Sequence, residues 1–184
     1  AARGWIVYGA ARRVDRMQEL EAAGCQVIAM DVTDDASLRA GVDRIIREQR
    51  RLDVLVNNAG YGSYGALEDV PIDEARRQFE VNVFGLARLS QLVIPTMRAL
   101  GRGRIINVSS IDGMRAGFSR NVPYGVAKGG IITLTRLSAV HHGRDNIRVN
   151  CLSPGPFPNP ESAPAAMVER LCEKLPMKRM GNNH

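Results

Sequence analysis

The chain has 184 residues, of which 45% are hydrophobic and 24% charged, which suits one globular domain with its own core and is too little for two. No stretch approaches the roughly 18 consecutive apolar residues of a membrane span, and the first residues lack a signal-peptide pattern, so we expect a cytoplasmic protein without membrane association. The net charge of +6 is spread among acidic residues, as in residues 43–51, and aromatic residues make up only 5% of the chain, so we expect no nucleic-acid partner.

Short β-branched runs alternate with longer helical patterns along the chain, which is typical of βαβ units and a parallel sheet covered on both faces. In chain order, the predicted strands are residues 5–8, 26–30, 54–57, 104–108 and 147–152. The predicted helices between them are residues 14–23, 34–49, 73–100 and 124–141. Five prolines within residues 154–164 predict a loop, followed by a short helix over residues 165–174. The fold class is therefore α/β, a doubly wound Rossmann-like sheet in three layers.

Tyr124 and Lys128 are four residues apart in a predicted helix, so their side chains share one face. A nearby ammonium favours the phenolate, and lowering a phenol pKa from about 10 to neutrality takes roughly 4 kcal/mol of differential stabilisation. Such a tyrosine can serve as a general acid or base. By itself the spacing favours a half-buried tyrosine with a solvated lysine, because Tyr and Lys four residues apart occur by chance in many helices.

Ser110 lies at the end of a predicted apolar strand, fourteen residues before Tyr124. The carboxyl edge of a parallel sheet is where ligands of open α/β folds bind. The intervening loop, which contains Gly113 and Gly117, is long enough to place Ser110 beside the start of the following helix. Taken alone, Ser109 and Ser110 could equally be turn residues.

Two further polar segments flank the predicted sheet. A buried strand runs into Asn57-Asn58-Ala59-Gly60, and Asn82 is a polar residue in an apolar helical segment. Residues 60–65 match the pattern G-x-G-x-x-G, with Glu80 twenty residues after its first glycine. In a dinucleotide fingerprint the last glycine opens the helix, whereas Pro71 and Asp73 place the predicted helix start well beyond it. We therefore do not interpret residues 60–65 as that fingerprint.

These motifs together resemble the short-chain dehydrogenase/reductase family, in order and in spacing, over essentially the whole chain. They are Asn57-Asn58-Ala59-Gly60, Asn82, Ser110, Tyr124 with Lys128, and Pro154-Gly155. The resemblance implies that Tyr124 exchanges a proton with the substrate oxygen while Lys128 lowers its pKa and holds the nicotinamide ribose. It also implies that Ser110 hydrogen-bonds the substrate and that Asn82 supports a water-linked proton path.

The same resemblance implies a nicotinamide cofactor, and charge favours NADP over NAD. NAD-binding folds place a carboxylate at the end of the second strand, where this chain has Ala11 followed by Arg12 and Arg13. Guanidinium groups suit a 2′-phosphate, although both arginines could also be solvated loop residues. The implied cofactor-binding residues are Arg12, Arg13, Asp31, Asn58, Ala59, Gly60, Tyr124, Lys128, Pro154 and Gly155. The cysteines Cys25, Cys151 and Cys172 lack metal-ligand spacing, and we predict no metal site.

The chain departs from the family pattern at both ends. The family's first strand and its glycine-rich phosphate loop have no counterpart, so we expect a partial domain, truncated or a mosaic, with an open slot one strand wide between strands 5–8 and 54–57. Residues 154–176 would form the substrate-binding loop and short helix, with Met114, Phe118, Phe157 and Met167 giving an apolar pocket for a small carbonyl or alcohol substrate.

The sequence leaves alternatives open for the oligomeric state and for the activity of the protein. The resemblance to the family implies that the long helices over residues 73–100 and 124–141 pair between copies in a homodimer or homotetramer. The leading hypothesis is an NADP-dependent oxidoreductase. A catalytically silent fragment acting only in oligomer assembly is the alternative, favoured by the missing phosphate loop. A sugar-nucleotide epimerase is a third hypothesis. The evidence against it is the motif Asn57-Asn58-Ala59-Gly60.

Overall fold

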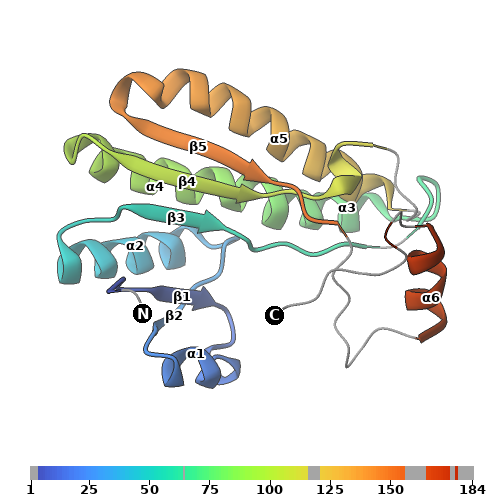
Figure 1. The fold of residues 1–184 in the computed structure, drawn as a ribbon, viewed down its shortest axis with the longest axis horizontal. Helices are drawn as coiled ribbons and strands as arrows, with labels where there is room; N and C mark the ends of the chain where they lie inside the picture. Colours follow the sequence, from blue (N-terminus) through green and yellow to red (C-terminus); the bar gives the residue numbers. More distant parts are fainter. Residues whose placement is uncertain (1–3, 64, 116–120, 156–164, 175–176, 178–184) are drawn as a thin grey trace.

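The computed structural model of the protein describes residues 4–63, 65–115, 121–155, 165–174 and 177. Its described strands, all parallel, are β1 (Tyr8–Ala11), β2 (Gln26–Ala29), β3 (Val54–Asn57), β4 (Gly103–Val108) and β5 (Ile147–Leu152). They form two separate sheets, one of order β1-β2 and one of order β3-β4-β5 (Figure 1). The predicted parallel α/β fold is confirmed.

The helices alternate with these strands, as the sequence pattern predicts. In chain order they are η1 (Val14–Arg16), α1 (Gln18–Ala22), α2 (Asp35–Gln49), α3 (Ile72–Phe79), the π-helical segment η2 (Glu80–Gly85), α4 (Leu86–Ala99), η3 (Ile111–Gly113), α5 (Val122–His142), η4 (Gly143–Asp145) and α6 (Ala165–Lys174). Asp34 caps α2 by accepting a hydrogen bond from the Ala36 N–H at 2.9 Å. No helix in the described ranges is both long and apolar enough to cross a membrane.

Three predicted elements differ clearly from the structure. The predicted helix over residues 14–23 is divided into the 3₁₀ turn η1 and the short helix α1. The first strand begins at Tyr8 instead of residue 5 and continues through Gly9 to Ala11, because pairing with β2 outweighs the weak strand propensity of these small residues. Gly9 also leaves room for Met17 of the neighbouring segment, whose Cε would lie 2.7 Å from an added Cβ. The predicted helix over residues 73–100 begins at Ile72 and is interrupted by the π-helical segment η2, which contains Asn82.

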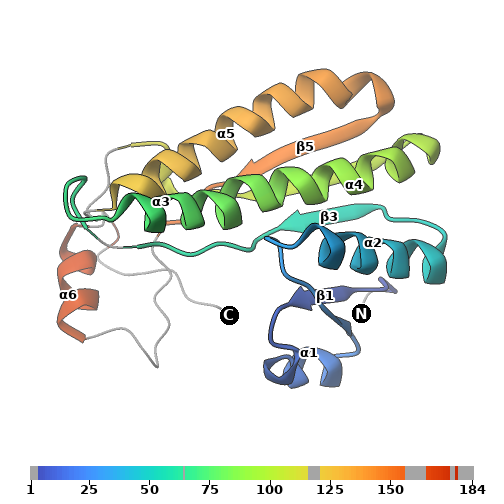
Figure 2. The same ribbon diagram turned by 180° about the vertical axis from the view of Figure 1, so that it is seen from behind.

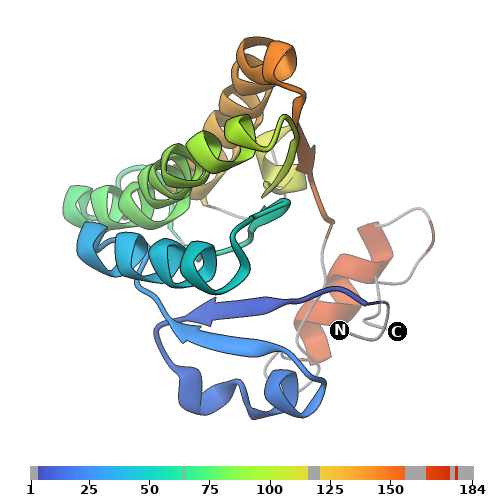
Figure 3. The same ribbon diagram turned by 90° about the vertical axis from the view of Figure 1, so that its left-hand side faces the viewer.

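Helices lie on both sides of the β1-β2 sheet, with α1 below it and α2 above it in Figure 3. Helices α4 and α5 cover one face of β3-β4-β5, as the view from behind shows (Figure 2). The main core lies beneath them and consists of Val42, Leu52, Val93, Met97, Ile105, Ile147 and Val149. On the other face, Val56 and Leu152 are more than half exposed. Among the residues that the structure describes, the third layer is therefore incomplete over β3-β4-β5.

The sheet is interrupted between β1 and β3, as predicted for a missing central strand. The Val7 carbonyl of one side accepts a hydrogen bond from β2, and the Asp53 carbonyl of the other accepts one from β4. Backbone groups alternate in direction along a strand, so those of Tyr8 and Ala10, and of Val54 and Val56, point toward the gap. The prediction that these strands do not pair directly is confirmed; the width of the slot stays a prediction.

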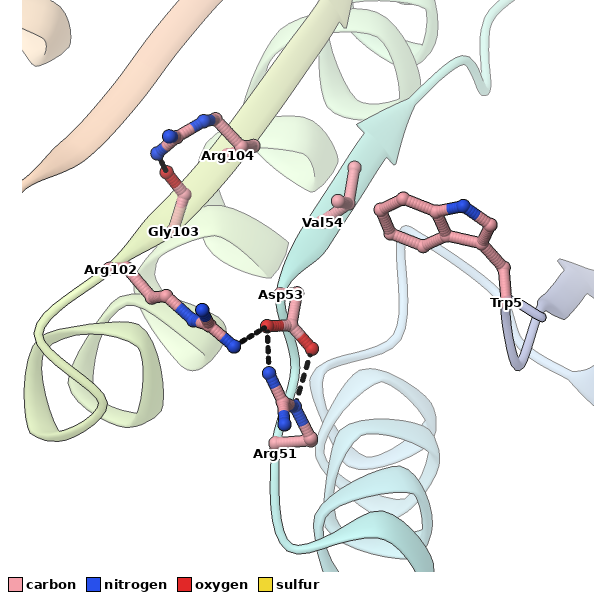
Figure 4. A pocket seen from close by; sticks show the side chains of 7 residues that line it. All are labelled: Trp5, Arg51, Asp53, Val54, Arg102, Gly103 and Arg104. Carbon is pink, nitrogen blue, oxygen red and sulfur yellow. Dashed lines mark hydrogen bonds and ion pairs between the residues drawn. The ribbon is translucent and has the colours of Figure 1, made fainter. Parts of the chain in front are cut away.

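A cavity of about 330 Å³ lies at the amino-terminal end of this gap, with Trp5 on one side and Val54 on the other (Figure 4). Asp53 forms ion pairs there with Arg51, at 2.5 Å, and with Arg102, at 3.4 Å. Trp5 is 59% exposed. The two pieces of sheet therefore present apolar and charged side chains to an open space rather than to each other.

Candidate functional site

The carboxyl ends of β4 and β5 are tied together, which places the predicted site residues at one edge of the sheet. The Ser109 N–H donates to the Leu152 carbonyl at 2.8 Å, and the Ile111 N–H donates to the Pro154 carbonyl at 3.0 Å. Ser110 lies between these two bonds, in the turn that leads from β4 into η3. The structure thus brings Pro154 beside Ser110.

Ser110 is the N-cap of η3. Its Oγ accepts a hydrogen bond from the Asp112 N–H at 3.2 Å, and its backbone is extended. A hydroxyl that accepts in this way keeps its own proton to donate. Ser110 can therefore cap its turn and donate to a substrate oxygen at the same time.

Lys128 is the buried cation of the site. Its side chain is on α5 and 4% of the residue is exposed. Its Nζ donates to the Val108 carbonyl at 2.8 Å and lies 5.5 Å from the centre of the Tyr124 ring. Burial lowers the pKa of Lys128 from its ordinary value, while a charge on Cys151 would raise it. The structure confirms that Tyr124 and Lys128 share a face of one helix.

Asn82 is fully buried and joins the loop after β3 to this cation. Its Nδ2 donates to the Tyr61 carbonyl at 2.8 Å, and its Oδ1 accepts from the Tyr61 N–H at 3.0 Å. A Cβ added to Gly60 would lie 2.9 Å from Asn82 Oδ1 and 3.4 Å from Lys128 Nζ. Gly60, Asn82 and Lys128 therefore meet at one point, and a glycine is what the close approach requires.

The predicted cofactor-binding residues after β3 are more exposed than Asn82 and Lys128. Asn58, Ala59 and Gly60 are exposed at the end of β3. Asp31 binds Thr33 through that residue's N–H and hydroxyl, and these hydrogen bonds, followed by the charge of Arg12, lower its pKa.

The Arg12 charge also acts on Tyr61, which follows β3. Arg12 directly follows β1 and is exposed. Arg13 is exposed at the start of η1, and Gly155 is exposed after Pro154.

The motif analysis included Asn57 but missed its buried partners, and it missed Asn121. Asn57 Nδ2 donates to Asn107 Oδ1 at 2.9 Å, and Asn107 Nδ2 donates to Thr135 Oγ1 at 2.9 Å, so β3, β4 and α5 are linked through the core. Asn121, 7% exposed, precedes Tyr124, and its Nδ2 would lie 2.9 Å from a Cβ on Gly62. A signal was available for the link of Asn57 to Asn107: two asparagines at matching positions of predicted neighbouring strands.

The segment that matches G-x-G-x-x-G does not open a helix. Gly65 forms an isolated bridge with Asn121, and α3 begins seven residues later at Ile72. The rejection of the fingerprint on helix position is confirmed. Among the described residues, no group of three or more His, Cys, Asp or Glu side chains is placed to hold a metal ion. Phe118 and Phe157 lie outside the described residues, as does the side chain of Met167.

Several proteins of known name are similar to this chain. Trans-4-hydroxycyclohexanecarboxylate dehydrogenase of Sinomonas cyclohexanicum is 42% identical over 136 residues, which are 74% of this chain and 52% of that protein. A short-chain type dehydrogenase/reductase from Mycobacterium marinum is 31% identical, with a TM-score of 0.86 over 96% of this chain and 72% of that one. The chain spans between 52% and 64% of the length of the first relatives it matches.

Two solved structures with named cofactors are also similar. Gluconate 5-dehydrogenase from Burkholderia cenocepacia, in complex with NADP and tartrate, has a TM-score of 0.88 and 28% identity over 99% of this chain and 75% of that one. An NAD⁺-bound xylitol dehydrogenase has a TM-score of 0.90 and 27% identity over 98% and 78%. A family model described as enoyl-(acyl carrier protein) reductase matches residues 2–184. The chain belongs to the short-chain dehydrogenase/reductase family.

Proposed function

We propose that this chain carries the catalytic part of an NADP-dependent oxidoreductase that interconverts a carbonyl compound and a secondary alcohol. The observation that carries the proposal is the meeting of Tyr124, Lys128 and Asn82 at the carboxyl edge of the sheet, with Ser110 on the adjoining turn. Bound NADP would supply or accept the hydride. The protein's own residues would bind the substrate and move the proton.

Tyr124 is the proposed general acid and base. The Lys128 ammonium near its ring favours the phenolate over the phenol, so the proton can leave or return near neutral pH. Ser110 would donate a hydrogen bond to the substrate oxygen and so stabilise the charge that develops there. Asn82 would hold the Tyr61 loop, and through it Gly60, against Lys128, keeping the proton path in place.

The residues present fit a nicotinamide cofactor. The Lys128 ammonium has three N–H donors, and one of them is directed to the Val108 carbonyl. Its remaining donors would hold the ribose hydroxyls, beside the exposed Asn58, Ala59 and Gly60. Arg12 and Arg13 follow β1 with their guanidinium groups exposed, which favours the 2′-phosphate of NADP. The NADP bound by gluconate 5-dehydrogenase supports this choice, and the NAD⁺ of xylitol dehydrogenase weighs against it.

The substrate would be a small molecule held over the carboxyl edge of the sheet. Helix α6 lies beyond the carboxyl ends of the strands in both side views (Figures 1 and 2). Residues 154–176, with Pro154 and Gly155 at their start, would form the wall of the substrate site. The hydroxy acid in the name of the Sinomonas relative and the tartrate in the gluconate 5-dehydrogenase structure suggest polyols and hydroxy acids as first substrates to test.

The proposal is tested by Tyr124→Phe, which removes one hydroxyl and little volume. Because general acid–base catalysis contributes about 10²–10⁴-fold, oxidation of a hydroxy-acid panel with NADP⁺, or reduction of a ketone panel with NADPH, should slow by at least about a hundredfold. Fluorescence titration with NADPH should still show binding, and the melting temperature should stay unchanged. Full activity in the variant would overturn the role of Tyr124. Absence of NADPH binding by the unaltered chain would instead favour the catalytically silent fragment.

A further inference from the structure

The backbone of Lys128, and not only its ammonium, is held by the turn that carries Ser110. Ser109 is 3% exposed, and its Oγ donates a hydrogen bond of 2.7 Å to the Lys128 carbonyl. Lys128 Nζ donates to the carbonyl of Val108, one residue earlier. Two successive residues of the strand end therefore bind the two ends of the same lysine.

Gly113 adds a third contact on the other side of Ser110. A Cβ at this position would lie 2.5 Å from the Lys128 carbonyl carbon and 2.7 Å from the Gly129 N. These are backbone atoms that cannot rotate away, so only glycine allows η3 to approach α5 this closely. The segment over residues 108–113 thus touches Lys128 before and after Ser110.

The Lys128 carbonyl would accept a hydrogen bond even without Ser109. It is in the interior of α5, where carbonyls accept from the N–H four residues later, and its second lone pair takes the extra bond. The Ser109 bond is therefore an added link between strand and helix. It is formed at the residue whose ammonium faces Tyr124 one turn earlier in the helix.

From these three contacts we propose that Ser109 is a positioning residue of the reaction: its hydroxyl fixes Lys128, and with it Tyr124, at a set distance from Ser110. The role rests on the proposed oxidoreductase function. Ser110 and Tyr124 must reach the same substrate oxygen, and a misplacement of about 1 Å can cost about a hundredfold in rate. A hydrogen bond between the two elements that carry them is a direct way to limit such movement.

The test compares Ser109→Ala with Ser109→Thr in the full chain. The matched control is Ser90→Ala on α4, away from Lys128. It removes a partly buried hydroxyl that donates to the Leu86 carbonyl at 2.9 Å and accepts from Asn57 Nδ2 at 3.0 Å. We expect Ser109→Ala to lower kcat by about tenfold to a hundredfold with little change in the KM for NADPH. Ser109→Thr keeps the hydroxyl and should restore most of the loss. Ser90→Ala should leave kcat near that of the unaltered chain.

A second readout does not depend on turnover. The Lys128 ammonium is titrated by NMR in lysine-labelled protein. The ionisable groups found near it are Tyr124 on its own helix and Cys151 of β5. Ser109→Ala should raise the pKa of Lys128 toward its ordinary value, because the released lysine gains water. Ser109→Thr and Ser90→Ala should leave it in place.

The outcomes separate the two proposals. If the unaltered chain shows no turnover, the proposed function fails, and the lysine titration still decides whether Ser109 holds Lys128. An unchanged Lys128 titration in Ser109→Ala overturns the positioning role. So does an equal loss of kcat in Ser109→Ala and Ser90→Ala, because the effect would then be one of general stability.

Discussion

Lys128 is both a buried charge and a residue of the proposed catalytic site. A buried ammonium is costly unless its donors are used, and here the Val108 carbonyl takes one of them at 2.8 Å. Burial lowers the pKa of Lys128. The same burial strengthens the interaction of its charge with Tyr124, because the site is less polar than water. An added Cβ at Gly113 would overlap the Lys128 peptide group, and one at Gly60 would overlap Asn82 Oδ1 and contact the Lys128 ammonium.

Arg12 and Arg13 carry the prediction on cofactor choice. Replacing both with alanine removes the charge proposed to bind the 2′-phosphate, and one charge-assisted hydrogen bond of about 1.5 kcal/mol corresponds to roughly tenfold in affinity. The Kd for NADPH should rise by about that factor or more, while that for NADH changes much less. Both constants are measured by quenching of protein fluorescence. An equal change for the two cofactors would show that these arginines do not recognise the phosphate.

At the scale of elements, the junction of η2 with the β2–α2 loop is closed by Gly85. A Cβ there would lie 2.6 Å from the Val32 carbonyl oxygen and 2.9 Å from Val32 Cβ. Gly85→Ala should therefore lower the free energy of unfolding by roughly 1–3 kcal/mol, as overpacking does.

Gly130 provides the matched control, since it is also helical but has no atom within 4 Å of an added Cβ. Gly130→Ala should raise the free energy of unfolding by about 0.5–1 kcal/mol through helix propensity alone. Urea denaturation followed by circular dichroism measures both. Stabilisation of similar size by the two alanines would mean that Gly85 is not at a close approach.

At the scale of the whole molecule, helix α5 presents apolar side chains to the outside. Val140 is 85% exposed and Leu137 66% exposed, one turn apart on the same face. We predict that this face pairs with that of a second copy in a homodimer or homotetramer. Val140→Lys should convert the assembly to monomer at micromolar concentration, measured by light scattering. A chain that is already monomeric without the substitution would contradict the pairing.

The gap between β1 and β3 predicts a second kind of association. Backbone groups at the facing edges of two sheets are templates for further strands, and lysine on such a strand is a known means of blocking them. Val56→Lys should therefore slow aggregation on heating, measured by turbidity, without changing the oligomer seen at low concentration. Val140→Lys should instead change the oligomer seen at low concentration and leave aggregation on heating unchanged. Leu67→Lys adds the same charge at an exposed loop residue and should change neither.

The sequence by itself determined the order of parallel strands and helices and the identity of the motif residues. Alternating apolar periods specify strands and helices locally, and a helix places residues four apart on one face whatever surrounds it, so Tyr124 and Lys128 could be paired without a structure. Their link to Asn82 through Gly60, by contrast, joins segments more than twenty residues apart in the chain.

Only the tertiary structure decided such long-range contacts. The bond from Ser109 to the Lys128 carbonyl, the buried linkage of Asn57 to Asn107, and the extension of β1 through Gly9 all depend on which element packs on which. Composition does not encode these contacts, because small and polar residues carry little periodic signal and acquire their partners only once strands and helices are assembled. For the same reason, the gap in the sheet could be predicted from the resemblance to a family. The residues at its two edges, and the charged residues Arg51, Asp53 and Arg102 at one end of it, were identified only from the structure.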